Sequence, residues 1–202
     1  MYPEDTRPFF SDENSEQVRK LTFYALPDNA HSFENDYAFF ILNIKGVIFH
    51  CITCFRQIDS TLLKSIEKRS FVQKAVCIVS QYPLYGIFLN KLDSTTFAYF
   101  NQKKFEDISI LKELYDSMIY GNNSLIEYTN LFLGFPLQKL VLAFKEKLFY
   151  LIKLLMLEKR IVVYSKQASA VSTFVLAVCS LFPGLLAFTY DKSVKINNFI
   201  VY

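Results

Sequence analysis

The apolar run from Leu137 to Gly184 constrains the fold most, because it contains two helix patterns on either side of a short β-branched stretch. Between 137 and 157, apolar residues recur at steps of three and four, which predicts one long helix. Ile161 to Tyr164 shows no alternation, which favours a strand buried on both faces. A second helix is predicted from Ala168 to Phe182, where a Pro-Gly pair ends it. This order of elements indicates an α/β layer with a parallel sheet.

The longest candidate for a membrane span, Val171 to Phe188, overlaps this run. A span needs about 20 apolar residues, and here serine, threonine and the Pro-Gly pair interrupt the stretch. A buried helix followed by a buried strand is therefore favoured over a transmembrane segment. The N-terminal sequence MYPEDTRPFF has neither the basic start nor the apolar core of a secretory signal. Four cysteines without regular spacing then favour a reducing compartment.

Charge is unevenly distributed along the 202 residues, although the formal net charge of +3 is too small to indicate nucleic-acid binding. Residues 1–37 carry eight acids and three bases, whereas residues 137–166 carry seven bases and two acids. Both regions are ordinary solvated faces on the simplest interpretation. The alternative is that 137–166 forms a basic surface that meets an acidic partner or an anionic membrane.

The first 120 residues predict strands followed by helices, which is typical of a small α+β module. Val47 to Phe55 is apolar on both faces, so we expect it to be an interior strand of the sheet. The chain is expected to exit this strand at Arg56 and Gln57. Gly121 to Thr129 is the predicted domain boundary. The other expected elements are a flexible acidic lead-in (1–20), strands at Leu21–Leu26, Tyr37–Asn43 and Phe71–Ser80, a turn at Lys45-Gly46, and helices at Leu84–Asn101 and Ile108–Ile119.

No nucleotide-binding or hydrolase motif is present. The five glycines are too scattered for a phosphate-binding loop, and there is no G-x-S-x-G sequence. Cys51 and Cys54 form a CxxC pair, but residues three apart on a strand point to opposite faces, so they are not expected to share a metal ion. Buried structural thiols are the favoured interpretation, with a redox role as the alternative. No catalytic, cofactor-binding or metal-binding residue is therefore assigned.

The two histidines and one acidic pair have mainly structural interpretations. His50 is predicted to be a core residue of its strand and His31 a turn residue, with a hydrolase that uses either histidine kept as an alternative. Glu106 and Asp107 are expected to stabilise the start of a helix through its dipole.

Several ordered motifs resemble one family of proteins. In chain order they are ALPDNAH (25–31), CFRQI (54–58), VQKAVCIVS (72–80), PLYG (83–86), ISILKELY (108–115), LEKR (157–160) and LFPG (181–184). Their order and spacing, over residues 21–186, are similar to the AVL family of DENN-domain proteins. Asn29 stands where that family usually has glycine. Against the family's pattern the chain begins after the first strands of the N-terminal module and ends early in the central one, which predicts a reduced or truncated member.

The resemblance implies an α/β fold with a longin-like N-terminal module over 21–120 and the start of a central DENN module over 130–202. It implies regulation of a Rab-type small GTPase in Golgi-to-plasma-membrane transport, with nucleotide exchange left open. DENN modules that promote exchange bind the GTPase across their two lobes and stabilise its nucleotide-free state. Arg56, Gln57 and Lys74 are the candidate partner-binding residues, since they are polar groups that border apolar strands. The expected localisation is cytoplasmic, with peripheral association with Golgi or secretory-vesicle membranes. A non-catalytic peripheral-membrane trafficking scaffold or adaptor is the alternative.

Overall fold

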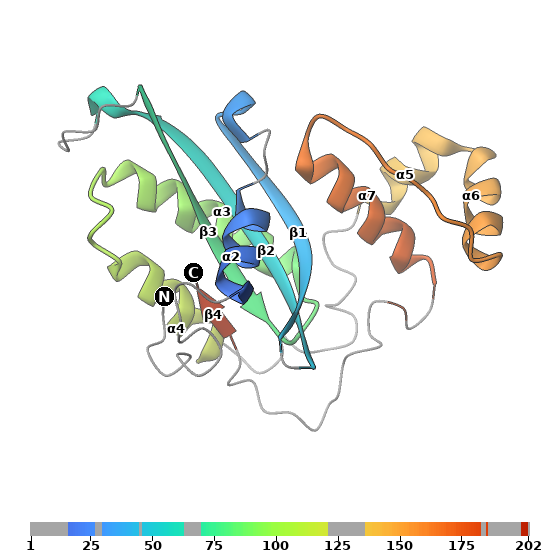
Figure 1. The fold of residues 1–202 in the computed structure, drawn as a ribbon, viewed down its shortest axis with the longest axis horizontal. Coiled ribbons are helices and arrows are strands. Elements are labelled where there is room, and N and C mark those ends of the chain that lie inside the picture. The colour runs from blue at the N-terminus through green and yellow to red at the C-terminus, as the bar shows by residue number, and fades with distance from the viewer. Residues whose placement is uncertain are drawn as a thin grey trace.

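A four-stranded antiparallel sheet organises the chain in the computed structural model, in the order β1-β2-β3-β4 (Figure 1). The structure describes residues 16–26, 30–44, 46–62, 70–120, 136–182, 185 and 199–201. The strands are β1 (Asn35–Ile44), β2 (Val47–Asp59), β3 (Phe71–Ser80) and β4 (Phe199–Val201). Gly46 lies in the turn between β1 and β2 with φ +85°, a conformation that favours glycine.

Strand β2 is interior to the sheet, as its two apolar faces predicted, because it pairs with β1 on one side and β3 on the other. One face contributes Phe49 and Cys51 to a core that also contains Leu21. The other face contributes Ile52 and Cys54 to a larger core beneath two helices. Cys51 and Cys54 therefore point to opposite sides of the sheet, as expected.

Helices cover both faces of this sheet (Figure 1). Helices α3 (Tyr85–Asn101) and α4 (Ser109–Ile119) pack on one face, where Leu92 and Met118 are buried against the strands. Helix α2 (Glu16–Ala25) lies against the other face through Leu21. Two short 3₁₀ helices, η2 (Ala30–Ser32) and η3 (Ser60–Leu62), flank the hairpin of β1 and β2. The chain is thus a mixed α/β fold, as predicted.

Two expectations for the N-terminal half are wrong. Residues 16–20, predicted as lead-in, and the predicted strand from Leu21 form helix α2 instead. Leu21 and Ala25, four residues apart, are both buried on one side of that helix, and Lys20 pairs with Glu16 at 2.6 Å. Residues 1–15 and the predicted boundary at 121–129 lie outside the described residues.

The predicted long helix over 137–157 is two helices, α5 (Leu137–Phe144) and α6 (Lys147–Met156). The chain bends at Lys145, which has φ +46°. A straight helix of this length would extend for about 30 Å, well past helix α7 (Ala168–Ser180), the 13-residue helix that it packs against. The bend lets Leu140 from α5 and Leu148 from α6 join one cluster with α7.

The expected buried strand at Ile161–Tyr164 and its parallel sheet are also wrong. The segment is irregular, and the side chains of Val162 and Tyr164 are 93% and 86% exposed. No described strand pairs with this segment, and every described strand pairing is antiparallel. The helix that follows, α7, packs along β1. Among the described residues, no helix combines the length and apolar character that crossing a bilayer requires.

Candidate partner-binding surfaces

The three predicted partner-binding residues all lie within the sheet, since β2 continues to Asp59 and does not end at Phe55. Arg56 and Lys74 are opposite each other on β2 and β3, on the face covered by α3 and α4. Gln57 is on the other face, where its side-chain oxygen accepts a 2.8 Å hydrogen bond from Gln73. The structure therefore brings Arg56 and Lys74 together and separates them from Gln57.

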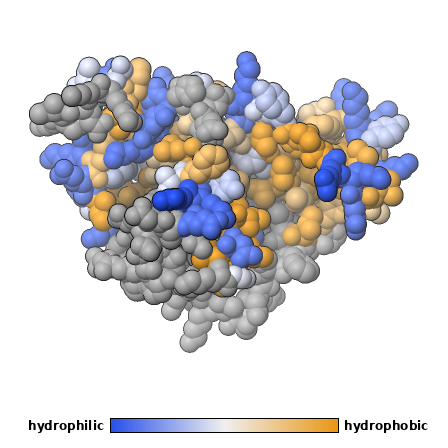
Figure 2. All heavy atoms as spheres, in the orientation of Figure 1, coloured by the Kyte–Doolittle hydropathy of each residue, from blue (hydrophilic) through white to orange (hydrophobic). Residues whose placement is uncertain are grey.

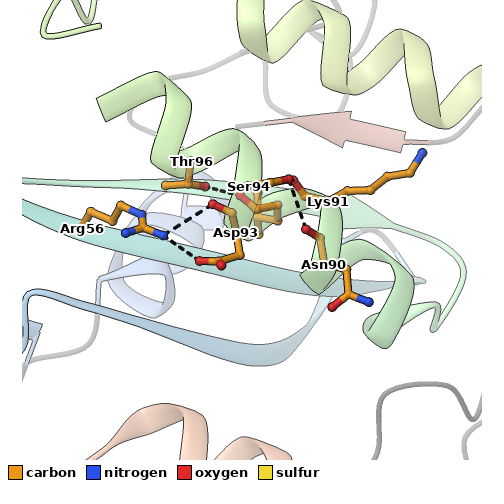
Figure 3. Close-up of polar contacts among 7 residues, drawn as sticks. Arg56, Asn90, Lys91, Asp93, Ser94 and Thr96 are labelled. Atoms are coloured by element: carbon orange, nitrogen blue, oxygen red, sulfur yellow. Dashed lines mark hydrogen bonds and ion pairs between the residues drawn. The ribbon is translucent and has the colours of Figure 1, made fainter. Parts of the chain in front are cut away.

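Arg56 is held by contacts within the protein (Figure 3). Its guanidinium donates a 2.7 Å hydrogen bond to the carboxylate of Asp93 on α3 and lies 5.4 Å from the ring centre of Phe97. The Lys74 ammonium lies 4.8 Å from the ring centre of Phe105. These contacts give both cations a role in joining the sheet to the α3–α4 layer. Their role in binding a partner stays a prediction.

We expect Arg56→Ala to lower the free energy of unfolding by about 1–2 kcal/mol, because it removes a charge-assisted hydrogen bond and packing on Phe97. The Arg56 side chain is 14% exposed, but Asp93 is 65% exposed, so solvent screening reduces the contribution of this pair. Lys74→Ala should cost only about 0.5 kcal/mol, through its contact with Phe105. Urea unfolding of both variants checks this ranking, and an equal loss for Lys74 would contradict it.

His50 is buried, as predicted, and its Nδ1 lies 2.7 Å from the hydroxyl oxygen of Tyr85 on α3. Burial lowers the pKa of His50 to about 4, so the imidazole is neutral at physiological pH. Ser80 stands opposite His50 on β3, a proximity that sequence reasoning missed. Ser80 is fully buried and its hydroxyl oxygen accepts a hydrogen bond from the backbone of Tyr82. This arrangement does not favour a hydrolase that uses His50, because both His50 and Ser80 are buried in the core.

The cysteine chemistry also favours structural roles. Burial raises the pKa of Cys54 to about 11 and raises the pKa of Cys77 and Cys179, so these thiols stay protonated and poorly reactive. In the part of the chain that the structure describes, no three His, Cys, Asp or Glu side chains converge closely enough to hold a metal ion.

Asp107 has the helix-start role predicted for the Glu106–Asp107 pair. Its carboxylate accepts a 3.0 Å hydrogen bond from the backbone N–H of Ser109, the first residue of α4. This bond lowers the pKa of Asp107. The negative charge thus stays beside the positive end of the helix.

An open apolar groove of about 650 Å³ lies where β1, α2 and α7 meet. None of its lining residues is charged, and several large side chains on its walls are exposed, including Phe23, Ile41 and Val175. Its lining is Phe23, Tyr24, Ala38, Phe39, Phe40, Ile41, Tyr85, Ala168, Val171, Ser172, Val175 and Leu176. No sequence pattern predicted the Phe23–Tyr24 wall, although the four-residue spacing of Leu21 and Ala25 could have indicated its helix.

The groove runs along the edge of β1. Four consecutive residues, Ala38 to Ile41, border it, although alternate residues of a strand point to opposite faces. In its floor, the Phe39 and Tyr85 rings are 5.2 Å apart and Tyr85 packs against Leu176 of α7. A buried carboxylate fixes the far wall, because Asp36 Oδ2 accepts a 3.3 Å hydrogen bond from the backbone N–H of Ser169 at the start of α7.

A second surface lies at the end of the molecule formed by α5 and α6. All seven bases of 137–166 are exposed, and large apolar side chains are exposed among them. Figure 2 shows apolar residues gathered over this end of the molecule, with hydrophilic residues between them. Large apolar side chains gathered in this way are unusual on a solvated face, where exposed apolar residues are normally scattered singly.

Together, the fold and these surfaces define a mixed α/β module with an open apolar groove beside an edge strand. The family described as "Transport protein Avl9" matches residues 4–199, nearly the whole chain. The chain belongs to this family.

Two relatives show the extent of the similarity. The "Late secretory pathway protein AVL9" of Saccharomyces cerevisiae is 33% identical over 209 residues, covering 89% of this chain and 27% of the yeast protein. The "Late secretory pathway protein avl9" of Schizosaccharomyces pombe is 32% identical over 179 residues, covering 86% of this chain and 37% of that protein. The chain thus spans between about a quarter and two fifths of the length of these relatives. No solved structure matches it.

Proposed function

We propose that this chain is a DENN-type regulator of late secretory transport that binds a Rab-type small GTPase on Golgi or secretory-vesicle membranes. The proposal includes a longin-like module over residues 21–120 and the start of a central DENN module over 130–202. Membership of the Avl9 family and the late secretory names of two relatives support this setting.

The position of the apolar groove carries the proposal. Strand β1 and helix α2 belong to the first proposed module, whereas α7 belongs to the second, so the groove lies between the two. A GTPase that binds across both lobes would cover this position. The groove offers apolar area and no charge, which suits a protein surface better than a phosphorylated small molecule.

Binding of the GTPase, without any bond-breaking step, would account for nucleotide exchange at such a surface. If the groove and its rim bind the nucleotide-free GTPase more tightly than the nucleotide-bound form, they shift the GTPase population toward nucleotide release. This mechanism requires no nucleophile or general base from the chain. It is compatible with a groove that has no charged lining residue and in which Tyr85 is buried in the floor, with His50 hydrogen-bonded to it.

The test is binding and nucleotide release across a panel of purified Rab proteins, each loaded with a fluorescent GDP analogue. We expect the chain to bind at least one of them, most tightly without nucleotide. Ile41→Lys should weaken that binding at least tenfold, because it places a charge in the groove on a residue that is 57% exposed and not needed for the core.

Phe71→Lys is the matched control. Phe71 is 53% exposed at the start of β3 and does not line the groove, so this variant should bind the GTPase as the wild type does. Absence of binding to every Rab protein would contradict the proposal. An equal loss in both variants would contradict the assignment of the groove.

One observation favours a second candidate function, a non-catalytic scaffold that contacts anionic membranes or coat proteins. Exposed bases outnumber acids by seven to two over residues 137–166. Long-range attraction to a negatively charged leaflet follows from such a surface and weakens as salt rises.

A further inference from the structure

Helix α6 is the most peripheral helix on its side of the molecule (Figure 1). It packs on α5, and its inner side contributes Leu148, Leu151 and Leu155 to the cluster with α7. The helix contains only lysines as polar residues apart from Tyr150, so it is apolar nearly all round. Helices of this type are normally buried or in contact with lipid.

The outer face of α6 is large, apolar and uncovered. The side chains of Phe149, Tyr150 and Met156 are 74%, 71% and 72% exposed. With Lys153 they lie on the side of the helix opposite the partly buried leucines, as a rotation of 100° per residue requires. Leu157, just after the helix, adds to the same side and is 55% exposed.

Basic residues outnumber acidic ones around this apolar face by five to two, the exposed acids being Glu146 and Glu158 at its two ends. Lys145 and Lys147 lie at its N-terminal end, Lys153 within it, and Lys159 and Arg160 just beyond it, all exposed. Among the described residues no carboxylate forms an ion pair with any of these five. Lysine and arginine stems can lie along an apolar surface while their charged ends reach outward.

We propose that the outer face of α6 docks on an anionic bilayer, with Phe149, Tyr150 and Met156 inserted among the lipid headgroups. A bilayer offers both components that this surface requires, an apolar interior for the aromatic rings and negative headgroups for the bases. An acidic protein surface without an apolar patch would satisfy the charges and leave the apolar face exposed. The inference deepens the second candidate function, on which it rests.

Insertion can be measured directly because the chain contains no tryptophan. In the Phe149→Trp variant, the tryptophan fluorescence should shift to shorter wavelength when vesicles with about one third phosphatidylserine are added. Brominated lipids in those vesicles should quench the fluorescence. The matched control is Tyr120→Trp, which labels a residue that is 83% exposed at the end of α4, across the sheet from α6 (Figure 1). Its emission should not change.

Vesicle flotation then separates the two contributions. Phe149→Ser with Tyr150→Ser, and separately Lys147→Glu with Lys153→Glu, should each reduce binding at least tenfold. Lys104→Glu, at an exposed site between α3 and α4, should reduce it less than twofold. Wild-type binding should fall as salt is raised, and vesicles of phosphatidylcholine alone should bind at least tenfold less.

Each alternative outcome overturns the inference. Charge reversal that reduces vesicle binding while the serine pair has no effect indicates electrostatic attraction to the headgroups without insertion of the apolar face. A dimer in solution that Phe149→Ser dissociates indicates that a second copy covers the face. Vesicle binding lost together with all Rab binding overturns both proposed functions, whereas intact Rab binding without vesicle binding overturns this inference alone.

Discussion

Leu92→Ala is expected to lower the free energy of unfolding by about 2–5 kcal/mol. Leu92 lies on α3 with no exposed surface, in the cluster that also contains Ile52 and Ile78 from the sheet. The substitution removes three buried carbon atoms and leaves a cavity between helix and strands, because the close-packed surroundings relax only partially. Urea denaturation followed by circular dichroism measures the loss.

Leu142→Ala is the matched control because it makes the same chemical change on α5, where Leu142 is 63% exposed. It should change the free energy of unfolding by less than about 0.5 kcal/mol. Losses of similar size in the two variants would mean that α3 does not pack on the sheet as described.

The second large effect is a loss of stability between pH 6.5 and 4, caused by His50. The pKa of His50 is lowered from 6.5 to about 4 in the folded chain, so in this pH range the unfolded chain binds a proton that the folded chain does not. This stabilisation is fully present above pH 6.5 and is lost as the pH falls to about 4. At 1.36 kcal/mol for each pKa unit, the contribution is about 3 kcal/mol.

The measurement compares wild type with His50→Gln, which keeps a hydrogen-bonding group near Tyr85 but does not titrate in this range. Carboxylates also titrate near pH 4, so the quantity to examine is the difference between the two stability curves. We expect the wild type to lose about 3 kcal/mol more than the variant between pH 7 and 4. Parallel curves would contradict the buried position of the imidazole.

Sequence reasoning succeeded where local pattern and burial agree. The unbroken apolar character of Val47 to Phe55 predicted the central strand, and the predicted helices at 84–101 and 108–119 match α3 and α4 within one residue. In these segments the apolar pattern of the element itself specifies which of its residues are buried. The local sequence is therefore sufficient to predict the element.

It failed where distant parts of the chain decide the outcome. Ile161 to Tyr164 has strand composition, but a strand needs a neighbour, and α7 lies beside β1. The bend at Lys145 has no glycine or proline to mark it, and it lets residues of both α5 and α6 pack against α7. The groove combines residues 23–24, 38–41 and 168–176, so no spacing in the sequence could reveal it.

The bond between Asp36 and Ser169 has a consequence for how the protein is made. It joins residues 133 positions apart, so β1 leaves the ribosome long before α7 exists. At about 5–20 residues per second, translation of the intervening segment takes roughly 7–27 seconds. During that interval the nascent chain carries an uncovered strand edge and apolar side chains that α7 will later shield. Chaperone protection of the growing polypeptide should therefore matter most before residue 180 emerges.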